Sequence, residues 1–304
     1  MYFVANDRVI DIAIAFLNSF RKFNPEIPLC LIPFTKDNNK LKQLQNQYRF
    51  SVYENQEMLT YCDELSRQFH QETIGHYRKL VIWDGPFDEF IYIDIDILIL
   101  KSLDFVFRLL EHYDFIVSCS NIPSTEKWVW KKSIYQTGKL TQEQIQYAAN
   151  TGFMVSKKHA IKKDDINMRI NAALELKQHM ELFCMDQSFI NYLIVTCGKR
   201  YTSFLLLLDS PLYPENYVEF WAGEDKKKLR EDLNTGLQTL LEGKWREVLL
   251  IHWAGVWQLK KSEIKLSNLL KSMKLRRYDW PVSIFMPLKK LWKHYRTMHL
   301  DMKA

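Results

Sequence analysis

The chain has 304 residues and a mass of 36.4 kDa, which suits one large domain or two small ones. Hydrophobic residues make up 47% and charged residues 26%, with only nine Gly and nine Pro, so the composition excludes disordered, collagen-like and linker-dominated chains. The formal net charge is +6, but residues 265–304 hold ten Lys and Arg against two Asp. The rest of the chain, with 32 basic and 34 acidic residues, carries −2. The basic character therefore belongs to a C-terminal tail.

The start of the chain and its cysteines bear on its location. The opening MYFVAND lacks the basic start and longer apolar run of a secretory signal peptide, because polar residues arrive at Asn6. No uncharged apolar run approaches the ~18 residues of a membrane-spanning helix. The five Cys are widely spaced and form no CxxC pair, which favours free thiols over a disulfide framework or a zinc cluster. We therefore expect a cytoplasmic protein with reduced thiols.

The first 120 residues alternate between two kinds of apolar pattern. Continuous apolar runs, typical of buried strands, occupy residues 2–5, 28–34, 50–53, 90–94 and 115–118. Helical patterning occupies residues 9–20, 38–48, 58–69, 74–83 and 103–110. Such alternation predicts an α/β sheet with mostly parallel strands, whose ligands bind at the carboxyl ends of the strands.

The remaining residues are less regular. A polar and aromatic insertion fills residues 120–150, and residues 209–223 are predicted as an aromatic-rich loop. Strands are predicted at residues 153–155, 204–208 and 249–252, and helices at residues 168–176 and 186–195. Because neither an internal repeat nor a Gly/Ser linker divides the chain, we predict one catalytic domain over residues 1–260 and a basic amphipathic tail over residues 261–304.

The sharpest feature is FIYIDIDIL, at residues 90–98. If the strand persists through both acidic residues, alternation places Asp94 and Asp96 on one face. Two neighbouring carboxylates repel each other unless a cation lies between them, and their hard oxygens suit Mg²⁺ or Mn²⁺ bound to a phosphate or diphosphate. In the alternative, both carboxylates are solvated at a strand end or cap the next helix. The long apolar lead-in favours the metal site.

Six blocks stand out in chain order: FVAND at 3–7, YRKL at 77–80, YIDID at 92–96, NTGF at 150–153, DQ at 186–187 and HWAG at 252–255. Together they resemble the retaining nucleotide-sugar glycosyltransferases of the GT-A fold, specifically glycosyltransferase family eight in its bacterial sugar transferase form. Their order and spacing fit the family over about residues 1–258, and the set is far more specific than any one block. The resemblance implies a Rossmann-like, mixed α/β sheet flanked by helices.

The resemblance also implies an activity and a site. A hexose would move from a nucleotide sugar, expected to be a UDP-sugar, to a glycan or glycolipid acceptor with retention. Mn²⁺ or Mg²⁺ on the donor diphosphate would be held by Asp94, Asp96 and His252. The reaction centre would contain Asn150, Asp186 and Gln187. The donor would be contacted by Ala5, Asn6, Asp7, Arg78, Asp94, Gly152, Gly255 and Lys260.

Some of these residues have structural alternatives. Asn6 and Asp7 can cap the helix beginning near Arg8, and Asp186 can cap the helix that follows it. Arg78, a donor contact by the resemblance, can instead be a surface charge on a helix. The adjacent Lys79 is expected to point elsewhere, so that only one of the two reaches the donor.

The segment after HWAG departs from the family. The family often continues with Lys-Pro-Trp, where this chain has VWQLKK at residues 256–261. In the family that lysine contacts the diphosphate, and here Lys260 or Lys261 would take its place.

Two further segments bear on partners. Aromatic residues in predicted loops either form a platform for a sugar acceptor or close the core; they are Trp128, Trp130, Tyr135, Tyr213, Tyr217, Phe220 and Trp221. Residues 284–298 combine apolar helical spacing with Lys and Arg, which suits either an anionic membrane surface on the inner face or a helix packed on the domain. The mildly acidic body and the lack of a recognition motif argue against a nucleic-acid partner.

Two other functions fit parts of the sequence. A phosphohydrolase of the haloacid-dehalogenase type also uses a strand-end DxD, but that motif belongs near the first strand and is followed by a late acidic pair that is missing here. A GT-A-like module that binds glycan or membrane without catalysis is the other alternative. The combination of Asp94, Asp96 and His252 argues against it.

Overall fold

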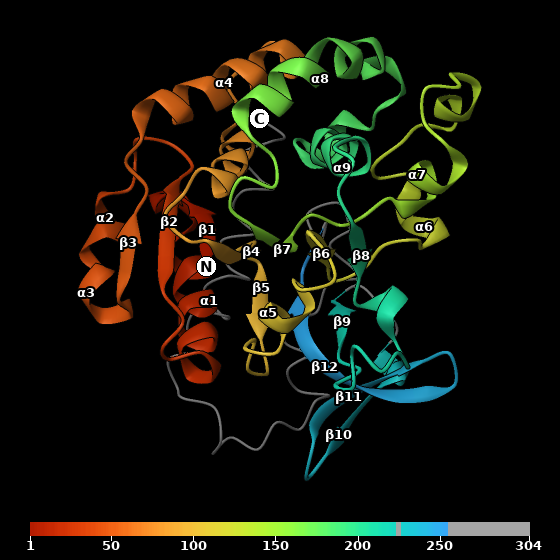
Figure 1. The fold of residues 1–304 in the computed structure, drawn as a ribbon. Helices are drawn as coiled ribbons and strands as arrows, with labels where there is room; N and C mark the ends of the chain where they lie inside the picture. The colour runs from red at the N-terminus through yellow and green to blue at the C-terminus, as the bar shows by residue number, and fades with distance from the viewer. Residues whose placement is uncertain (223–225, 255–304) are drawn as a thin grey trace, which may run out of the picture.

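The computed structural model describes residues 1–222 and 226–254 and is built around a seven-stranded sheet of order β3-β2-β1-β4-β7-β6-β8 (Figure 1). The strands of this sheet are β1 (Tyr2–Ala5), β2 (Leu29–Pro33), β3 (Phe50–Val52), β4 (Glu89–Ile93), β6 (Phe115–Val117), β7 (Phe153–Lys157) and β8 (Tyr201–Ser203). Strand β7 runs antiparallel to both neighbours, and every other pairing is parallel. The mixed α/β sheet predicted from the sequence is confirmed.

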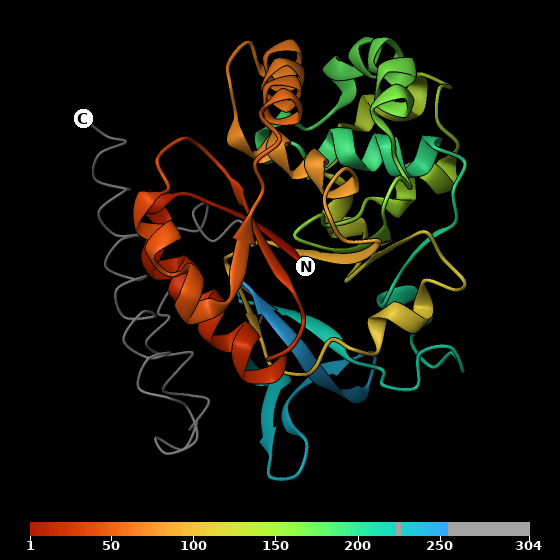
Figure 2. The ribbon, with the colours of Figure 1, turned by 60° about the vertical axis from the view of Figure 1, so that its left-hand side comes forward.

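Both faces of this sheet are buried because its strands are apolar on both sides. In β1, Tyr2 and Val4 join one hydrophobic cluster while Phe3 and Ala5 join the other, as the alternation of strand side chains requires. The first cluster includes α4 (Gln56–His70), the 3-10 segment η2 (Gly75–Trp83) and α9 (Gln187–Thr196). The second includes α1 (Ile10–Phe23). Figure 2 shows α1 on one side of the strands and the group containing α4 and α8 (Lys163–Glu175) on another.

A second sheet has the order β10-β11-β12-β5, with β9 pairing on β12. Its strands are β5 (Ile97–Ile99), β9 (Val218–Trp221), β10 (Leu229–Asp232), β11 (Gly236–Leu241) and β12 (Lys244–His252). The β10–β11 hairpin projects at the bottom of Figure 1. Phe220, Leu237 and Val248 pack with Ile12 and Ala15 of α1, so this sheet shares a core with the rest of the domain.

The remaining elements are short. The other helices are α2 (Asn39–Gln43), α3 (Gln45–Tyr48), α5 (Val106–Leu109), α6 (Pro123–Glu126) and α7 (Gln142–Tyr147). The other 3-10 segments are η1 (Asp7–Val9), η3 (Lys132–Gln136), η4 (Lys177–His179), η5 (Leu182–Cys184), η6 (Leu205–Leu207) and η7 (Lys226–Lys228). Polar side chains cap the N-termini of some of these elements. At the start of α7, for example, Thr141 and Gln144 form a reciprocal capping box.

Three predictions about elements are wrong. Residues 204–208, predicted as a strand, contain η6, and the strand β8 lies just before them. The predicted loop at residues 209–223 contains β9, and residues 74–83 form a 3-10 helix rather than an α-helix. A run of apolar residues such as 204–208 reports burial but not backbone conformation, so a strand and a short helical turn look alike in sequence.

The described part of the chain ends at Ala254. Gly255, Lys260 and the tail at residues 261–304 lie outside the described residues, so the boundary at residue 260 stays a prediction. Within residues 1–222 and 226–254, no helix is both long and apolar enough to cross a membrane.

Candidate metal and donor site

The antiparallel strand β7 brings two of the sequence blocks together. Its register pairs Phe153 with Ile93, the last residue of β4. The backbone N–H of Asp94 then donates to the carbonyl oxygen of Gly152 at 2.7 Å. Because β7 runs opposite to β4, the block Asn150–Gly152 at its start lies at the edge where β4 ends.

Asp94 and Asp96 lie in a turn between β4 and β5. The expectation that one strand persists through both is wrong, because β4 ends at Ile93. The chain must leave one sheet at this point to enter the other, where β5 begins at Ile97. The two carboxylates nevertheless converge with His252, and one ligand atom from each of the three residues lies within 4.8 Å of the others.

His252 reaches the turn from the far end of the domain sequence. Strand β12 pairs antiparallel with β5, and the register places His252 opposite Ile97. The N–H of Trp253 donates to the carbonyl oxygen of Asp96 at 3.1 Å, which ties the end of β12 to the turn. The imidazole Nε2 lies 3.5 Å from Oδ1 of Asp96.

The three side chains fit a divalent cation. Oδ1 of Asp96 is buried and has no hydrogen-bond partner within the part of the chain that the structure describes. The imidazole Nε2 at 3.5 Å offsets part of the cost of burying this oxygen, and a cation bound to the oxygen would offset the rest. Two carboxylates and an imidazole form a donor set that suits Mn²⁺, and the carboxylates also suit Mg²⁺.

Gly152 closes the space around these three side chains. A Cβ atom at this position would lie 2.5 Å from Cε1 of His252, 2.9 Å from Oδ1 of Asn150 and 3.0 Å from Oδ2 of Asp94. Any side chain would therefore displace at least one proposed ligand. The glycine is required here by close approach of the neighbouring groups.

Carboxylates on both sides of the His252 ring control its pKa. Burial lowers the pKa of the imidazole, but the carboxylates of Asp96 and Glu219 outweigh burial and raise the pKa to about 10. Without a cation, the ring therefore carries both protons between two carboxylates. A cation at Nε2 would replace one of these protons.

Lys79 lies inside the site, contrary to the prediction that it points elsewhere. Its side chain is 3% exposed, and Nζ lies 3.0 Å from Oδ2 of Asp186 and 3.6 Å from Oδ1 of Asp94. Burial lowers the pKa of Lys79, but Asp186 and Asp94 raise it above its ordinary value. In return, Lys79 and the hydroxyl of Tyr92, which donates to Asp94, lower the pKa of Asp94 against the effect of burial. The site therefore holds a buried cation of its own.

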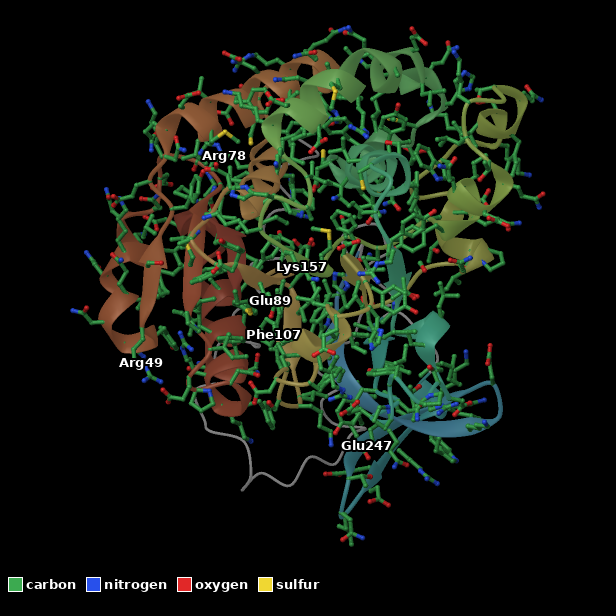
Figure 3. All side chains as sticks on the ribbon, in the orientation of Figure 1. Arg49, Arg78, Glu89, Phe107, Lys157 and Glu247 are labelled. Atoms are coloured by element: carbon green, nitrogen blue, oxygen red, sulfur yellow. The ribbon has the colours of Figure 1, made fainter. Side chains whose placement is uncertain are left out.

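Arg78 lies beside α4, where Figure 3 labels it. Its Nε and Nη2 atoms donate to the two carboxylate oxygens of Asp63 at 2.8 and 2.7 Å, and Nη1 donates to the carbonyl oxygen of Pro33 at 2.8 Å. Segment η2 packs between α4 and the sheet, so the neighbouring residues Arg78 and Lys79 point to different sides of it. The side chain of Arg78 joins α4 to the end of β2, and that of Lys79 enters the site.

The three residues predicted for the reaction centre are brought together. Oδ1 of Asn150 accepts the N–H of Gly152 at 2.8 Å. Oε1 of Gln187 accepts the N–H of Thr151 at 3.3 Å, and Nε2 donates to the carbonyl oxygen of Trp128 at 3.1 Å. Asp186 makes no side-chain cap to α9, so its alternative role as a helix cap is wrong.

Asn191, which the sequence analysis did not single out, fastens α9 to this block. Its side chain accepts the N–H of Ala149 at 2.7 Å and donates to the carbonyl oxygen of the same residue at 2.8 Å. Nothing in the local sequence distinguishes this asparagine from any other polar residue on a helix.

The residues at the end of β1 are largely engaged in structural hydrogen bonds. Asn6 accepts the N–H of Arg8 as the cap of η1, which confirms its capping alternative. Both carboxylate oxygens of Asp7 accept N–H groups of Lys40 and Leu41, at 2.9 Å each, so Asp7 caps α2 rather than its own helix. Ala5 is buried at the end of the strand.

Two other residues near the site carried no recognisable signal in the sequence. Glu219, from the segment predicted as a loop, contacts His252. His76 packs edge-on against Phe34 and interacts electrostatically with Asp186. Only tertiary pairing places either side chain near the acidic turn.

The predicted aromatic platform divides into core and surface residues. Trp130, Tyr213 and Phe220 are buried and close the core. Tyr135 is exposed, while Trp128 is partly buried. The members left at least partly exposed are Trp128, Tyr135, Tyr217 and Trp221.

No family model and no curated protein matches the sequence. The chain is similar to solved structures of glycosyltransferases. Galactosyltransferase LgtC, in complex with donor and acceptor sugar analogs, is 12% identical, with 93% of this chain and 99% of that chain covered and a TM-score of 0.52. The bifunctional glycosyltransferase WbbM, in its apo structure, is also 12% identical with a TM-score of 0.52; 94% of this chain is covered, but it spans only 51% of WbbM. These likenesses show the fold: the chain has the GT-A fold of glycosyltransferases.

Proposed function

We propose that this protein is a metal-dependent glycosyltransferase that moves a hexose from a UDP-sugar to a glycan or glycolipid acceptor with retention. The observation that carries the proposal is the convergence of Asp94, Asp96 and His252, together with a buried oxygen of Asp96 that makes no hydrogen bond within the described residues. The cluster lies at the edge of a GT-A sheet where parallel strands end, which is where such sheets bind ligands. The fold shared with LgtC, whose structure contains donor and acceptor sugar analogs, supports the assignment.

Asp94, Asp96 and His252 would hold Mn²⁺, or Mg²⁺ in its place. When bound, this cation stabilises the negative charge that grows on the departing diphosphate. The imidazole favours Mn²⁺, because Mg²⁺ prefers oxygen ligands.

The other side chains of the site would bind and orient the donor sugar. Lys79 lowers the pKa of Asp94, pairs with Asp186, and provides a fixed positive charge in a buried place. Asp186 and Asn150 are suited to accept hydrogen bonds from sugar hydroxyls. Gln187, whose amide is held on both sides, is a weak nucleophile. We therefore infer that the departing phosphate assists the incoming hydroxyl on the same face of the sugar.

The remaining residues complete the donor site. Ala5 and Asn6 lie at the end of β1, where the nucleoside would bind, and Asp7 supports them by capping α2. Arg78 would support the donor site indirectly, because its hydrogen bonds to Asp63 and to the carbonyl oxygen of Pro33 hold α4 against the end of β2. Gly152 leaves room for the ligands.

Two proposed donor contacts and the membrane contact lie outside the described residues. Gly255 and Lys260 would contact the donor diphosphate. Residues 284–298 would rest on an anionic membrane and bring the enzyme to a lipid-borne acceptor on the inner face.

A panel of nucleotide sugars tests the proposal directly. The full chain is incubated with each sugar and Mn²⁺, and release of free sugar and nucleotide diphosphate is followed in the presence and absence of EDTA. Slow hydrolysis of one UDP-sugar that stops with EDTA is expected. Asp96→Asn should abolish it, whereas Asp88→Asn, at an exposed aspartate before β4, should not.

Two outcomes of this experiment would contradict the proposal. If Asp96→Asn leaves metal-dependent turnover unchanged, the metal assignment is wrong. Turnover of an aryl phosphate with Mg²⁺, without turnover of any nucleotide sugar, would instead favour the phosphohydrolase.

A further inference from the structure

We propose that Glu219 is a positioning residue that holds the imidazole of His252 in the orientation and tautomer required of a metal ligand. The inference rests on the proposed function, because it concerns the same metal site. It adds a carboxylate from β9, outside every block that the sequence analysis identified.

Both carboxylate oxygens of Glu219 are engaged. Oε1 lies 2.5 Å from Nδ1 of His252, and Oε2 accepts the hydroxyl of Ser118 at 2.5 Å. The Glu219 side chain is 1% exposed, and that of His252 is 2% exposed. A carboxylate buried to this degree is tolerated only when its oxygens have strong partners.

The strand pairing explains why these groups meet. Strand β9 runs parallel to β12, with Trp221 opposite His252 and Glu219 opposite Leu250. Side chains two residues apart share one face of a strand, so Glu219 and Trp221 both lie on the side of the imidazole. The Trp221 ring is centred 5.9 Å from the His252 ring. Ser118, directly after β6, reaches Glu219 from the seven-stranded sheet.

Glu219 affects metal binding by setting which nitrogen of the His252 imidazole carries the proton. A neutral imidazole has one N–H, and hydrogen bonding to Glu219 places it on Nδ1. The lone pair is then on Nε2, the nitrogen 3.5 Å from Oδ1 of Asp96. A carboxylate behind a histidine ligand also makes the ligating nitrogen more basic. Ser118, Glu219 and His252 thus form a chain that ends at the proposed cation.

Mn²⁺ affinity in the absence of nucleotide tests this inference without relying on activity. Free Mn²⁺ is measured by its electron paramagnetic resonance signal in titrations of the full chain. Glu219→Gln preserves shape but removes the charge, and it should weaken Mn²⁺ binding about 10-fold or more. The imidazole nitrogen coupling to bound Mn²⁺ should weaken as well. Glu231→Gln, at an exposed glutamate on β10, is the matched control and should bind Mn²⁺ as the parent chain does.

The outcomes separate the two proposals. If the parent chain binds no Mn²⁺, or Asp96→Asn binds it equally well, the metal centre itself is wrong. If the parent binds Mn²⁺ with an imidazole nitrogen coupling and Glu219→Gln binds it within twofold, the role of Glu219 is overturned.

A second variant covers the case in which Glu219→Gln does not fold. Ser118→Ala frees one oxygen of Glu219 and should weaken Mn²⁺ binding by about two- to fivefold, since a hydrogen bond to a charged group is lost. Unchanged affinity in Ser118→Ala, together with failure of Glu219→Gln to fold, would assign Glu219 a purely structural role and overturn the inference.

Discussion

At the scale of single residues, the most consequential group is the buried ammonium of Lys79. It lies between Asp186 and Asp94, with 3.0 and 3.6 Å separations, and above the ring of Tyr92 at 4.7 Å from the centroid. Removing one partner of a buried ion pair leaves the other charge uncompensated, which is far costlier than losing an exposed pair. Lys79 therefore contributes to stability as well as to the proposed site.

Lys79→Met should lower the free energy of unfolding by about 3–5 kcal/mol, because Asp186 stays buried without its partner. Urea denaturation followed by circular dichroism measures the change. The double variant Lys79→Met/Asp186→Asn removes both charges and should recover at least half of the loss. A loss under about 1 kcal/mol in the single variant would show that Asp186 does not depend on Lys79.

Sequence patterns predicted some residues of the site and missed others for a physical reason. Asp94 and Asp96 stand out because charged groups rarely end an apolar strand, and His252 because it ends another. Lys79 and Glu219 are set in their places by long-range packing of η2 and β9. Lys79 lies in the YRKL block, but its local sequence, like that of Glu219, fits an exposed position equally well, so no local pattern places either side chain in the site.

At the scale of elements, the reversal of β7 assembles the site. A strand antiparallel to β4 presents its start where β4 ends, and Gly152 then lies against Asp94 and His252. The change of sheet between β4 and β5 turns the acidic pair toward β12. Each block on its own lacks this geometry, which explains why the set of blocks is informative while single blocks are weak.

Gly152→Ala tests that assembly. The added methyl group would lie 2.5 Å from Cε1 of His252, so the ring must move. Mn²⁺ affinity should fall at least about 10-fold, with a loss of about 1–3 kcal/mol in stability from overpacking.

Gly138→Ala is the control for this substitution. Its site is open, but φ is +63°, so strain alone should cost about 1 kcal/mol while Mn²⁺ binding is unchanged. Equal Mn²⁺ affinities in both variants, measured by titration calorimetry, would contradict the proposed packing around Gly152.

Most elements of the seven-stranded sheet were predictable from sequence, and most of the second sheet was not. Strands buried on both faces, such as β1 and β2, are continuous apolar runs. Strand β10 is short and largely exposed, with the sequence LRED, so it lacks any apolar signal. Its pairing with β11 depends on neighbouring strands rather than on its own composition.

At the scale of the whole molecule, charge is divided between the body and the tail. Residues 265–304 carry +8 against −2 for the rest of the chain. A sequence that separates charge in this way can place a catalytic domain at an anionic surface without changing its chemistry.

Replacing Lys289, Lys290, Lys293 and Arg296 with Glu should therefore abolish binding to vesicles with 30% anionic lipid, as judged by co-sedimentation. Each basic residue near such a surface contributes about 1 kcal/mol, so the four together should contribute about 4 kcal/mol, roughly a 1,000-fold change in affinity. Hydrolysis of the soluble donor should stay unchanged. Undiminished vesicle binding by this variant would contradict the proposed role of residues 284–298.

Titration calorimetry of UDP into the full chain, with and without Mn²⁺ and with Asp96→Asn in parallel, tests whether Asp94, Asp96 and His252 form a metal site for a nucleotide diphosphate. UDP should bind the parent chain only when Mn²⁺ is present and should not bind Asp96→Asn under either condition. UDP binding of equal strength with and without Mn²⁺, or in Asp96→Asn, would contradict this assignment.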